Sequence, residues 1–207
     1  MRIIKPGFII EDEINGIEVL KKIERAGRTC YKSEAKITED SCREFVKKII
    51  ASGHHSVLEH EKVTVRVVCD RSTSHQGVRH RIATFSQESQ RFCNYSKEGF
   101  GNEITFVQPD FDLEEDDIDL LRAIEAHYFK KIAQGKKPQQ ARYFLPNGTK
   151  TEFVVSMNLR SWRHFFELRT SPKADSQIQA LAKGLLAEFR RLIPVIFDDI
   201  TPEEPTL

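Results

Sequence analysis

Residues 78–95 of the chain read VRHRIATFSQESQRFCNY, and the rest of the sequence is best understood from this stretch. An Arg-His-Arg run at residues 79–81 is followed by Ser89 and Arg91, with hydroxyl and amide side chains between them and Glu88 as the single acid. Guanidinium groups and neutral donors with few acids nearby are typical of a site for an anion such as phosphate. The alternative is a solvated surface with scattered salt bridges, which does not need this density of neutral donors.

A short helix is expected to lead into this stretch. Asp70 is a candidate N-cap, and residues 71–82 contain no proline and one glycine. One face of that helix would carry Thr73, Gln76, Arg79 and His80. Arg81 would point elsewhere, so the helix end could serve two anionic ligands. Residues 84–92 then read as a polar loop or strand that completes a phosphate site.

The composition indicates a globular chain. Its 207 residues suit one domain over residues 1–207, and 39% hydrophobic with 30% charged residues indicates neither disorder nor a membrane-embedded chain. No apolar run is long enough to span a membrane, and the first residues lack the apolar core of a signal peptide, so we expect a cytoplasmic protein. The formal net charge of +1 makes the arginine cluster a local feature, which favours small phosphorylated molecules over nucleic acid.

Neither the cysteines nor the histidines predict a metal site. The cysteines, at positions 30, 42, 69 and 93, form no CxxC pair, so we expect free thiols packed in the core. Residues 54–60 contain three histidines and Glu59 but no H-E-x-x-H pattern, so no metal is expected. We interpret this segment as a loop that hydrogen-bonds a cofactor or caps the next strand.

Hydrophobic periodicity predicts strands and helices in a mixed order. Strands are expected at residues 2–4, 8–10, 61–69, 104–107 and 150–157. Helices are expected at residues 14–27, 38–51, 118–133, 139–144, 158–168 and 176–193. The strand at 61–69 has the clearest alternation, with Val63, Val65 and Val67 on one face. In the helix after Asn158, we expect Trp162 and its aromatic neighbours to lie in the core.

Together these segments resemble the flavin-dependent thymidylate synthases. The signature of that family is Arg-His-Arg, seven residues and then Ser, which stands here as residues 79–81 and Ser89, followed by Arg91. Further anchors occur in the same order at residues 53–60, 141–146 and 158–169, so the resemblance covers roughly residues 28–190. The chain departs from the common pattern at Ser86, Gln87, Phe92 and Ser176, where the family often has Asn, Glu, Tyr and Trp.

The resemblance implies a fold and an activity. The fold would be α/β (α+β), a single domain with a central, mostly antiparallel sheet flanked by helices, assembled as a homotetramer with active sites at subunit junctions. The activity would be reductive methylation of dUMP to dTMP. The methylene group would come from 5,10-methylenetetrahydrofolate, and FAD reduced by NADPH would supply the hydride.

The resemblance also assigns site residues by matching position. Those that would hold FAD are His54, Ser56, Arg79, His80, Arg81, Gln87, Asn158, Arg160 and His164. Those that would hold dUMP are Gln76, Arg79, Gln87, Ser89, Arg91, Arg142 and Arg169. Arg169, Ser89 and His54 would act at the reacting groups. An arginine near the pyrimidine carbonyls would stabilise negative charge as it develops, and Ser89 is expected to be a ligand because no His and Asp can be assigned to activate it.

Two other functions stay open from the sequence. A nucleic-acid-binding module would use Arg71, Arg79, Arg81 and Arg91 on phosphates, with affinity that falls steeply with salt. A nucleotide-binding regulator would keep the dUMP site but lack turnover because of the changes at positions 86, 87 and 92.

Overall fold

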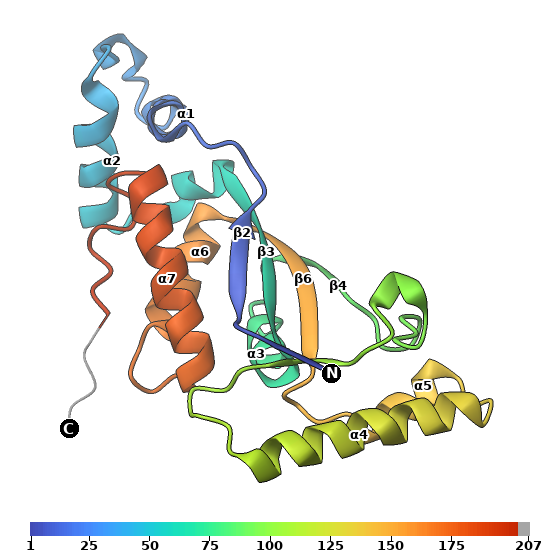
Figure 1. The fold of residues 1–207 in the computed structure, drawn as a ribbon. Helices are drawn as coiled ribbons and strands as arrows, with labels where there is room; N and C mark the ends of the chain where they lie inside the picture. The colour runs from blue at the N-terminus through green and yellow to red at the C-terminus, as the bar shows by residue number, and fades with distance from the viewer. Residues whose placement is uncertain (203–207) are drawn as a thin grey trace. The chain divides into compact units, whose positions relative to one another are not determined.

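The computed structural model describes residues 1–202, drawn as a coloured ribbon in Figure 1. These residues divide into two compact units. Unit 1 comprises Met1–Gly7, Val67–Arg79 and Phe85–Val154. Unit 2 comprises Phe8–Arg66, His80–Thr84 and the described chain from residue 155 onward. A single domain over residues 1–207 stays a prediction, and residues 203–207 lie outside the described part of the chain.

The strands form two sheets. A four-stranded sheet has the order β2-β3-β6-β4, and β1 pairs with β5 in parallel, with Arg2 opposite Thr105. The strands are β1 (Arg2–Ile4), β2 (Gly7–Ile10), β3 (Lys62–Asp70), β4 (Thr84–Gln87), β5 (Thr105–Val107) and β6 (Lys150–Asn158). The predicted strands are confirmed, as is the mixed α/β class with a mostly antiparallel sheet.

Strand β3 shows why alternation predicted the sheet well. Val63, Val65 and Val67 are buried, whereas Thr64 and Arg66 between them are partly exposed. Successive side chains of a strand point to opposite faces, so one face of β3 belongs to the core. Burial of each valine contributes about 1.5–3 kcal/mol of hydrophobic free energy.

Unit 2 contains most of the helices. They are α1 (Gly16–Thr29), α2 (Ser41–Ala51), α6 (Leu159–Arg169) and α7 (Ser176–Leu192), with 3-10 helices η1 (Glu34–Lys36) and η2 (His55–His60). Asn158 is confirmed as the N-cap of α6, because its side chain accepts a hydrogen bond from the Ser161 backbone N–H.

An aromatic core holds α6 and α7 together in unit 2. Trp162 stacks on Phe166 at 5.8 Å between ring centroids, and Phe189 and Phe197 pack against the same pair. The Trp162 indole N–H donates to the Val63 carbonyl at 3.0 Å, so this large side chain is buried without an unsatisfied donor. The expectation that the aromatic face of α6 lies in the core is confirmed.

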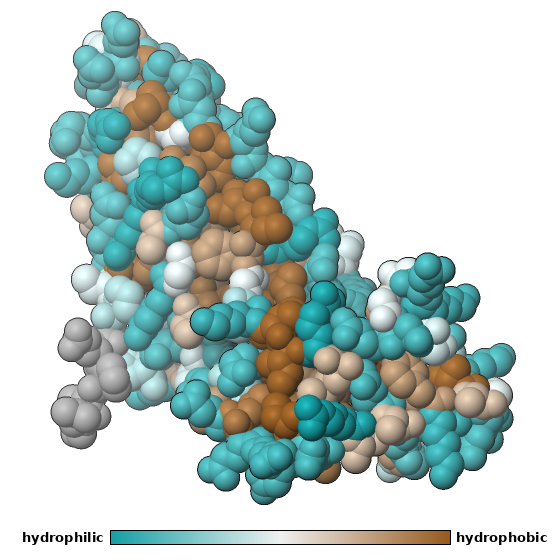
Figure 2. Space-filling model, in the orientation of Figure 1, coloured by the Kyte–Doolittle hydropathy of each residue, from teal (hydrophilic) through white to brown (hydrophobic). Residues whose placement is uncertain are grey.

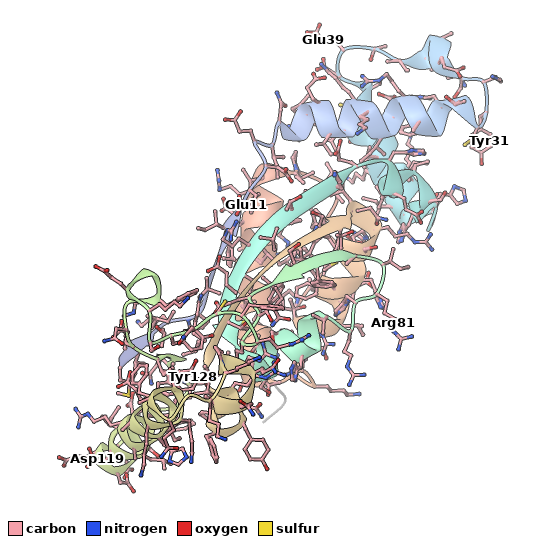
Figure 3. All side chains as sticks on the ribbon, turned by 90° about the vertical axis from the view of Figure 1, so that its right-hand side faces the viewer. Glu11, Tyr31, Glu39, Arg81, Asp119 and Tyr128 are labelled. Carbon is pink, nitrogen blue, oxygen red and sulfur yellow. The ribbon has the colours of Figure 1, made fainter. Side chains whose placement is uncertain are left out.

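Unit 1 contains α3 (Arg71–Gly77), α4 (Glu115–Ala133), α5 (Pro138–Ala141) and the 3-10 helices η3 (Glu98–Phe100) and η4 (Arg142–Phe144). Tyr128 of α4 is fully buried in a cluster with Tyr95, Ile104 and Phe106. Figure 3 shows Tyr128 and the exposed Asp119 on this helix, and Figure 2 shows hydrophilic side chains interspersed with apolar ones over it. None of the helices within residues 1–202 could cross a lipid bilayer.

Helix α3 corrects the prediction for the residues that lead into the Arg-His-Arg segment. It ends at Gly77 rather than near Ile82, with Val78 N–H donating to the Ser74 carbonyl. The chain must leave the helix here because β4 pairs with β6 from Thr84 onward. The predicted common helical face is therefore wrong, although Asp70 is confirmed as the N-cap through its bond from Thr73 N–H. Thr73 itself is buried.

Other helix ends also differ from prediction, because capping contacts set them. α2 begins at Ser41, whose hydroxyl accepts from Thr38 N–H. α4 begins at Glu115 because Glu114 and Asp117 form a capping box. The predicted helix 139–144 is instead α5 followed by η4.

Gly27 does not end α1, which continues to Thr29. A Cβ at Gly27 would lie only 2.7 Å from ring atoms of Phe45, so this glycine allows α1 and α2 to approach closely. The prediction that Gly27 is a C-cap was wrong because a packing glycine and a capping glycine look alike in sequence.

The cysteines only partly follow the core prediction. Cys42 and Cys69 are buried free thiols, as expected. Cys30 is exposed because it caps the end of α1 where the chain enters a surface loop, and Cys93 is only partly buried.

Candidate functional site

The Arg-His-Arg segment follows α3 and precedes β4, outside any helix. His80 is buried with 8% of its surface exposed, whereas the side chains of Arg79 and Arg81 are exposed. Figure 3 shows Arg81 extending away from the ribbon. The histidine therefore belongs to the packed interior of unit 2, and its arginine neighbours are accessible to ligands.

In unit 2, His80 meets two further residues that the sequence assigned to the site. The Nε of Arg169 donates a hydrogen bond to Nε2 of His80 at 3.1 Å. The ring of His164 lies edge-on to His80 at 5.9 Å between centroids, and Phe165 lies at 4.9 Å. The tertiary structure thus joins residues 80 and 169, which are far apart in the sequence.

The electrostatics of this cluster favour a neutral His80. Burial, followed by the positive charge of Arg169 and the nearby His164, lowers the pKa of His80 to about 4. Burial also lowers the pKa of Arg169, which stays a cation at neutral pH because the pKa of a guanidinium group is so high. Since Arg169 donates to Nε2, the neutral imidazole carries its proton on Nδ1.

Among the other predicted flavin residues of unit 2, His54 directly precedes η2, Ser56 lies on it, and Asn158 and Arg160 flank the start of α6. His54 and Ser56 are exposed, and His54 directly follows the turn at Gly53, where φ is +70°. Arg160 at the start of α6 pairs with Glu59 of η2 at 2.6 Å, which links the two elements. The side-chain Oδ1 of Asn158 already accepts from the Ser161 N–H to cap α6, which leaves the side-chain NH₂ group as the donor that could meet a ligand.

The histidines of residues 54–60 do not gather into a ligand set. No group of three or more His, Cys, Asp or Glu side chains suited to a metal ion occurs within residues 1–202.

In unit 1, the predicted substrate residues Ser89 and Arg91 form a tight turn after β4. The Ser89 hydroxyl oxygen accepts from Arg91 N–H at 3.3 Å, and the Ser89 carbonyl accepts from Phe92 N–H and Cys93 N–H. The Arg91 guanidinium lies over the Phe92 ring at 5.3 Å and is otherwise exposed. The turn therefore presents a hydroxyl and a guanidinium group from positions two residues apart.

A partly buried polar network supports this turn, and no sequence pattern predicted it. Glu88 accepts hydrogen bonds of 2.7 Å from both Tyr95 Oη and Lys150 Nζ, while its backbone N–H donates to the Glu152 carbonyl on β6. Burial and the charge of Glu88 raise the pKa of Tyr95, which keeps its hydroxyl protonated as a donor. The only hint in the sequence was that Glu88 is the sole acid in the cluster.

Gln87, another predicted ligand residue, is held by two hydroxyl groups. Its Nε2 donates to Ser74 Oγ at 3.0 Å and to Thr151 Oγ1 at 3.1 Å. The Ser74 hydroxyl donates to the Arg71 carbonyl, so Ser74 must accept from Gln87. The Oε1 atom of Gln87 is therefore left as an acceptor.

The accessible arginines differ from those used for packing. The guanidinium groups of Arg79, Arg81, Arg91 and Arg142 form no ion pair or hydrogen bond with any residue in 1–202, whereas those of Arg160, Arg163 and Arg191 are paired with acids. This distribution favours an anion site over a surface of scattered salt bridges. Within the described residues of unit 1, no hydrogen bond joins the Arg142 guanidinium group to the turn formed by Ser89 and Arg91.

Comparison with known proteins identifies the family. The family model described as thymidylate synthase complementing protein matches residues 16–195. A Geobacter sulfurreducens protein named flavin-dependent thymidylate synthase is 34% identical over 86% of this chain and 80% of its own length. The chain belongs to this family. Another flavin-dependent thymidylate synthase, from Pyrococcus furiosus, is 35% identical over 85% of this chain and 72% of its own length.

The fold of this flavin-dependent thymidylate synthase family member also matches a solved structure. The UMP/dUMP methylase PolB from Streptomyces cacaoi, bound with 5-Br dUMP, superposes with a TM-score of 0.76 over 96% of each chain at 22% identity. The fold and the family that the Arg-His-Arg signature implied are therefore both confirmed. The roles of individual residues stay predictions.

Proposed function

We propose that this protein converts dUMP to dTMP by reductive methylation, with 5,10-methylenetetrahydrofolate as the carbon donor and FAD reduced by NADPH as the hydride source. The family match over residues 16–195 carries the proposal, because it includes every residue assigned to the site. A homotetramer and a cytoplasmic location are further parts of the proposal that rest on the resemblance.

The nucleotide phosphate would bind to the turn of unit 1. Ser89 Oγ accepts from Arg91 N–H, so its own proton can be donated to a phosphate oxygen. The Arg91 guanidinium has no acidic partner within residues 1–202, and a bidentate bond to phosphate would satisfy it. Each charge-assisted bond of this kind contributes roughly 1.5–3 kcal/mol. Arg142, which also has no acidic partner within residues 1–202, is a further cation proposed for dUMP.

Recognition of the sugar and base would use neutral groups as well. The Oε1 atom of Gln87 is left as an acceptor, which suits a hydroxyl or imide N–H of the nucleotide. Gln76 on α3 and Arg79 are proposed to complete this set. No base activates Ser89 within the described residues, which supports its role as a ligand rather than a nucleophile.

Arg169 would act on the pyrimidine. For C5 to attack the methylene carbon, the ring must carry enolate-like negative charge that extends to its carbonyl oxygens, and a fixed guanidinium group stabilises that charge where it develops. Arg169 is held by His80 and is only partly exposed, so little reorganisation is needed during the reaction.

The donors of unit 2 fit an anionic dinucleotide such as FAD. Arg81 has no acidic partner in the described chain, and the exposed Arg160–Glu59 pair can be exchanged for a phosphate at low cost. His54 and Ser56 add accessible neutral groups, with His164 on α6. When bound, FAD would supply the hydride. The protein's own residues would bind it, orient it and, through His54, support the transfer of the carbon unit.

An assay of the purified protein tests the proposal. Flavin absorbance is expected after FAD is added, and dTMP is expected from dUMP, methylenetetrahydrofolate, FAD and NADPH together. Omission of FAD or of the folate should abolish product. Binding of dUMP without dTMP formation would support the regulator instead, and binding to duplex DNA that survives 200 mM salt would favour the nucleic-acid module.

A further inference from the structure

We propose that His80 is a positioning residue for Arg169: its unprotonated Nε2 accepts the Arg169 Nε–H and fixes the guanidinium group where the pyrimidine binds. This inference rests on the proposed function, because it assigns Arg169 to dUMP. The resemblance assigned His80 only to FAD, so the link between the two residues is an additional role.

The contact has the geometry of an orienting hydrogen bond. The donor–acceptor distance is 3.1 Å, and the donor is the Nε–H of Arg169, so the bond holds the guanidinium group at the atom nearest its side-chain stem. Phe165 fixes the plane of the imidazole from 4.9 Å, at an interplanar angle of 63°. A buried ring held by an aromatic neighbour can set the direction of the guanidinium group.

The charges around His80 favour the acceptor form. Arg169 and His164 face it from α6, and Arg79 and Arg81 flank it in the chain. No acidic side chain within residues 1–202 bonds to His80, so a second proton on the ring would place two cations against each other. The neutral ring thus accepts from Arg169 at Nε2 and keeps Nδ1–H as its single donor.

Two substitutions separate this role from simple packing. His80→Phe keeps an aromatic ring against Phe165 but removes the acceptor. His80→Gln loses the ring but places an acceptor oxygen at a similar distance from the backbone. With saturating FAD, we expect His80→Phe to lower kcat/KM for dUMP about 10- to 100-fold, in line with loss of a charge-assisted bond, and His80→Gln to recover most of that loss.

A double-mutant cycle tests whether His80 acts through Arg169. In an Arg169→Ala background, His80→Phe should change kcat/KM for dUMP by less than about twofold, because the group that it positions is gone. If the losses of the two single variants multiply, His80 acts independently of Arg169 and the inference is wrong. A role in FAD binding alone would make the His80→Phe defect disappear at saturating FAD.

A spectroscopic measurement does not depend on activity. In ¹⁵N NMR spectra of the histidine-labelled wild-type protein, the signal lost in His80→Gln should show the Nδ1–H tautomer and remain neutral at pH 5. An Nε2–H tautomer would overturn the proposal even if His80→Phe failed to fold. If the wild-type enzyme forms no dTMP while the tautomer is as expected, the proposed function fails and the His80–Arg169 contact stands.

Discussion

Arg163 and Asp199 are joined by two hydrogen bonds, of 2.6 and 2.7 Å, between the guanidinium group on α6 and a carboxylate beyond α7. Arg163 is buried in unit 2, and the side chain of Asp199 is 51% exposed. The hydrogen bonds from Arg163 lower the pKa of Asp199. This pair ties the segment after α7 to the aromatic core.

Substitution Asp199→Asn should therefore destabilise the protein. It leaves the buried Arg163 cation with only the longer ion pair to Glu167 at 3.8 Å, and breaking a pair such as Arg163–Asp199 costs about 3–5 kcal/mol when both partners are buried. Because Asp199 is half exposed, we expect about 2 kcal/mol in the free energy of unfolding, measured by urea denaturation. Glu188→Gln on α7 is the matched control, since it breaks an exposed pair with Arg191, and an equal loss there would contradict this reasoning.

The low pKa of His80 predicts an acid-dependent loss of stability. The folded state holds the pKa at about 4, below its usual 6.5, so the folded protein binds fewer protons in this range. The stabilisation that the neutral His80 gives to the folded state is complete above pH 6.5 and is lost as the pH falls to 4. The free energy of unfolding falls by at most about 3 kcal/mol over this interval. The difference in unfolding free energy between wild type and His80→Gln should shrink over this interval. A constant difference would show that His80 does not titrate as described.

The two ligands should respond separately to substitutions in the two units. Arg91→Ala removes the unpaired guanidinium of the unit 1 turn and should weaken dUMP binding about 10-fold or more, with FAD affinity nearly unchanged. His54→Ala should impair use of flavin or folate and leave dUMP binding intact. Calorimetry with dUMP and flavin fluorescence measure the two affinities. Equal loss of both ligands in both variants would refute the assignment.

The support of the Ser89–Arg91 turn can be tested without touching a ligand residue. Tyr95→Phe removes a 2.7 Å hydrogen bond to Glu88, and Lys150→Met removes the other. We expect each to cost roughly 1–2 kcal/mol of stability, with Lys150→Met the larger because it leaves Glu88 without its cation. Both should raise the dissociation constant for dUMP more than that for FAD. Unchanged dUMP binding in both would mean that the network serves stability alone.

Local patterns predicted most of the fold. The alternation in β3, the N-caps Asp70 and Asn158, and the aromatic face of α6 act within a few residues, so they can be read from the sequence. Errors arose where a distant contact decided the outcome. Gly27 looked like a helix end but packs against Phe45.

The sequence by itself determined the family and predicted which residues form the candidate site, because the Arg-His-Arg signature and its companion segments are specific in order and spacing. Only the tertiary structure decided which charged groups pair with each other. His80 accepts from Arg169, 89 positions away, and Glu88 accepts from Lys150, 62 positions away. Such pairs depend on the distance and burial of groups that packing brings together, and neither quantity is encoded in the local order of residues.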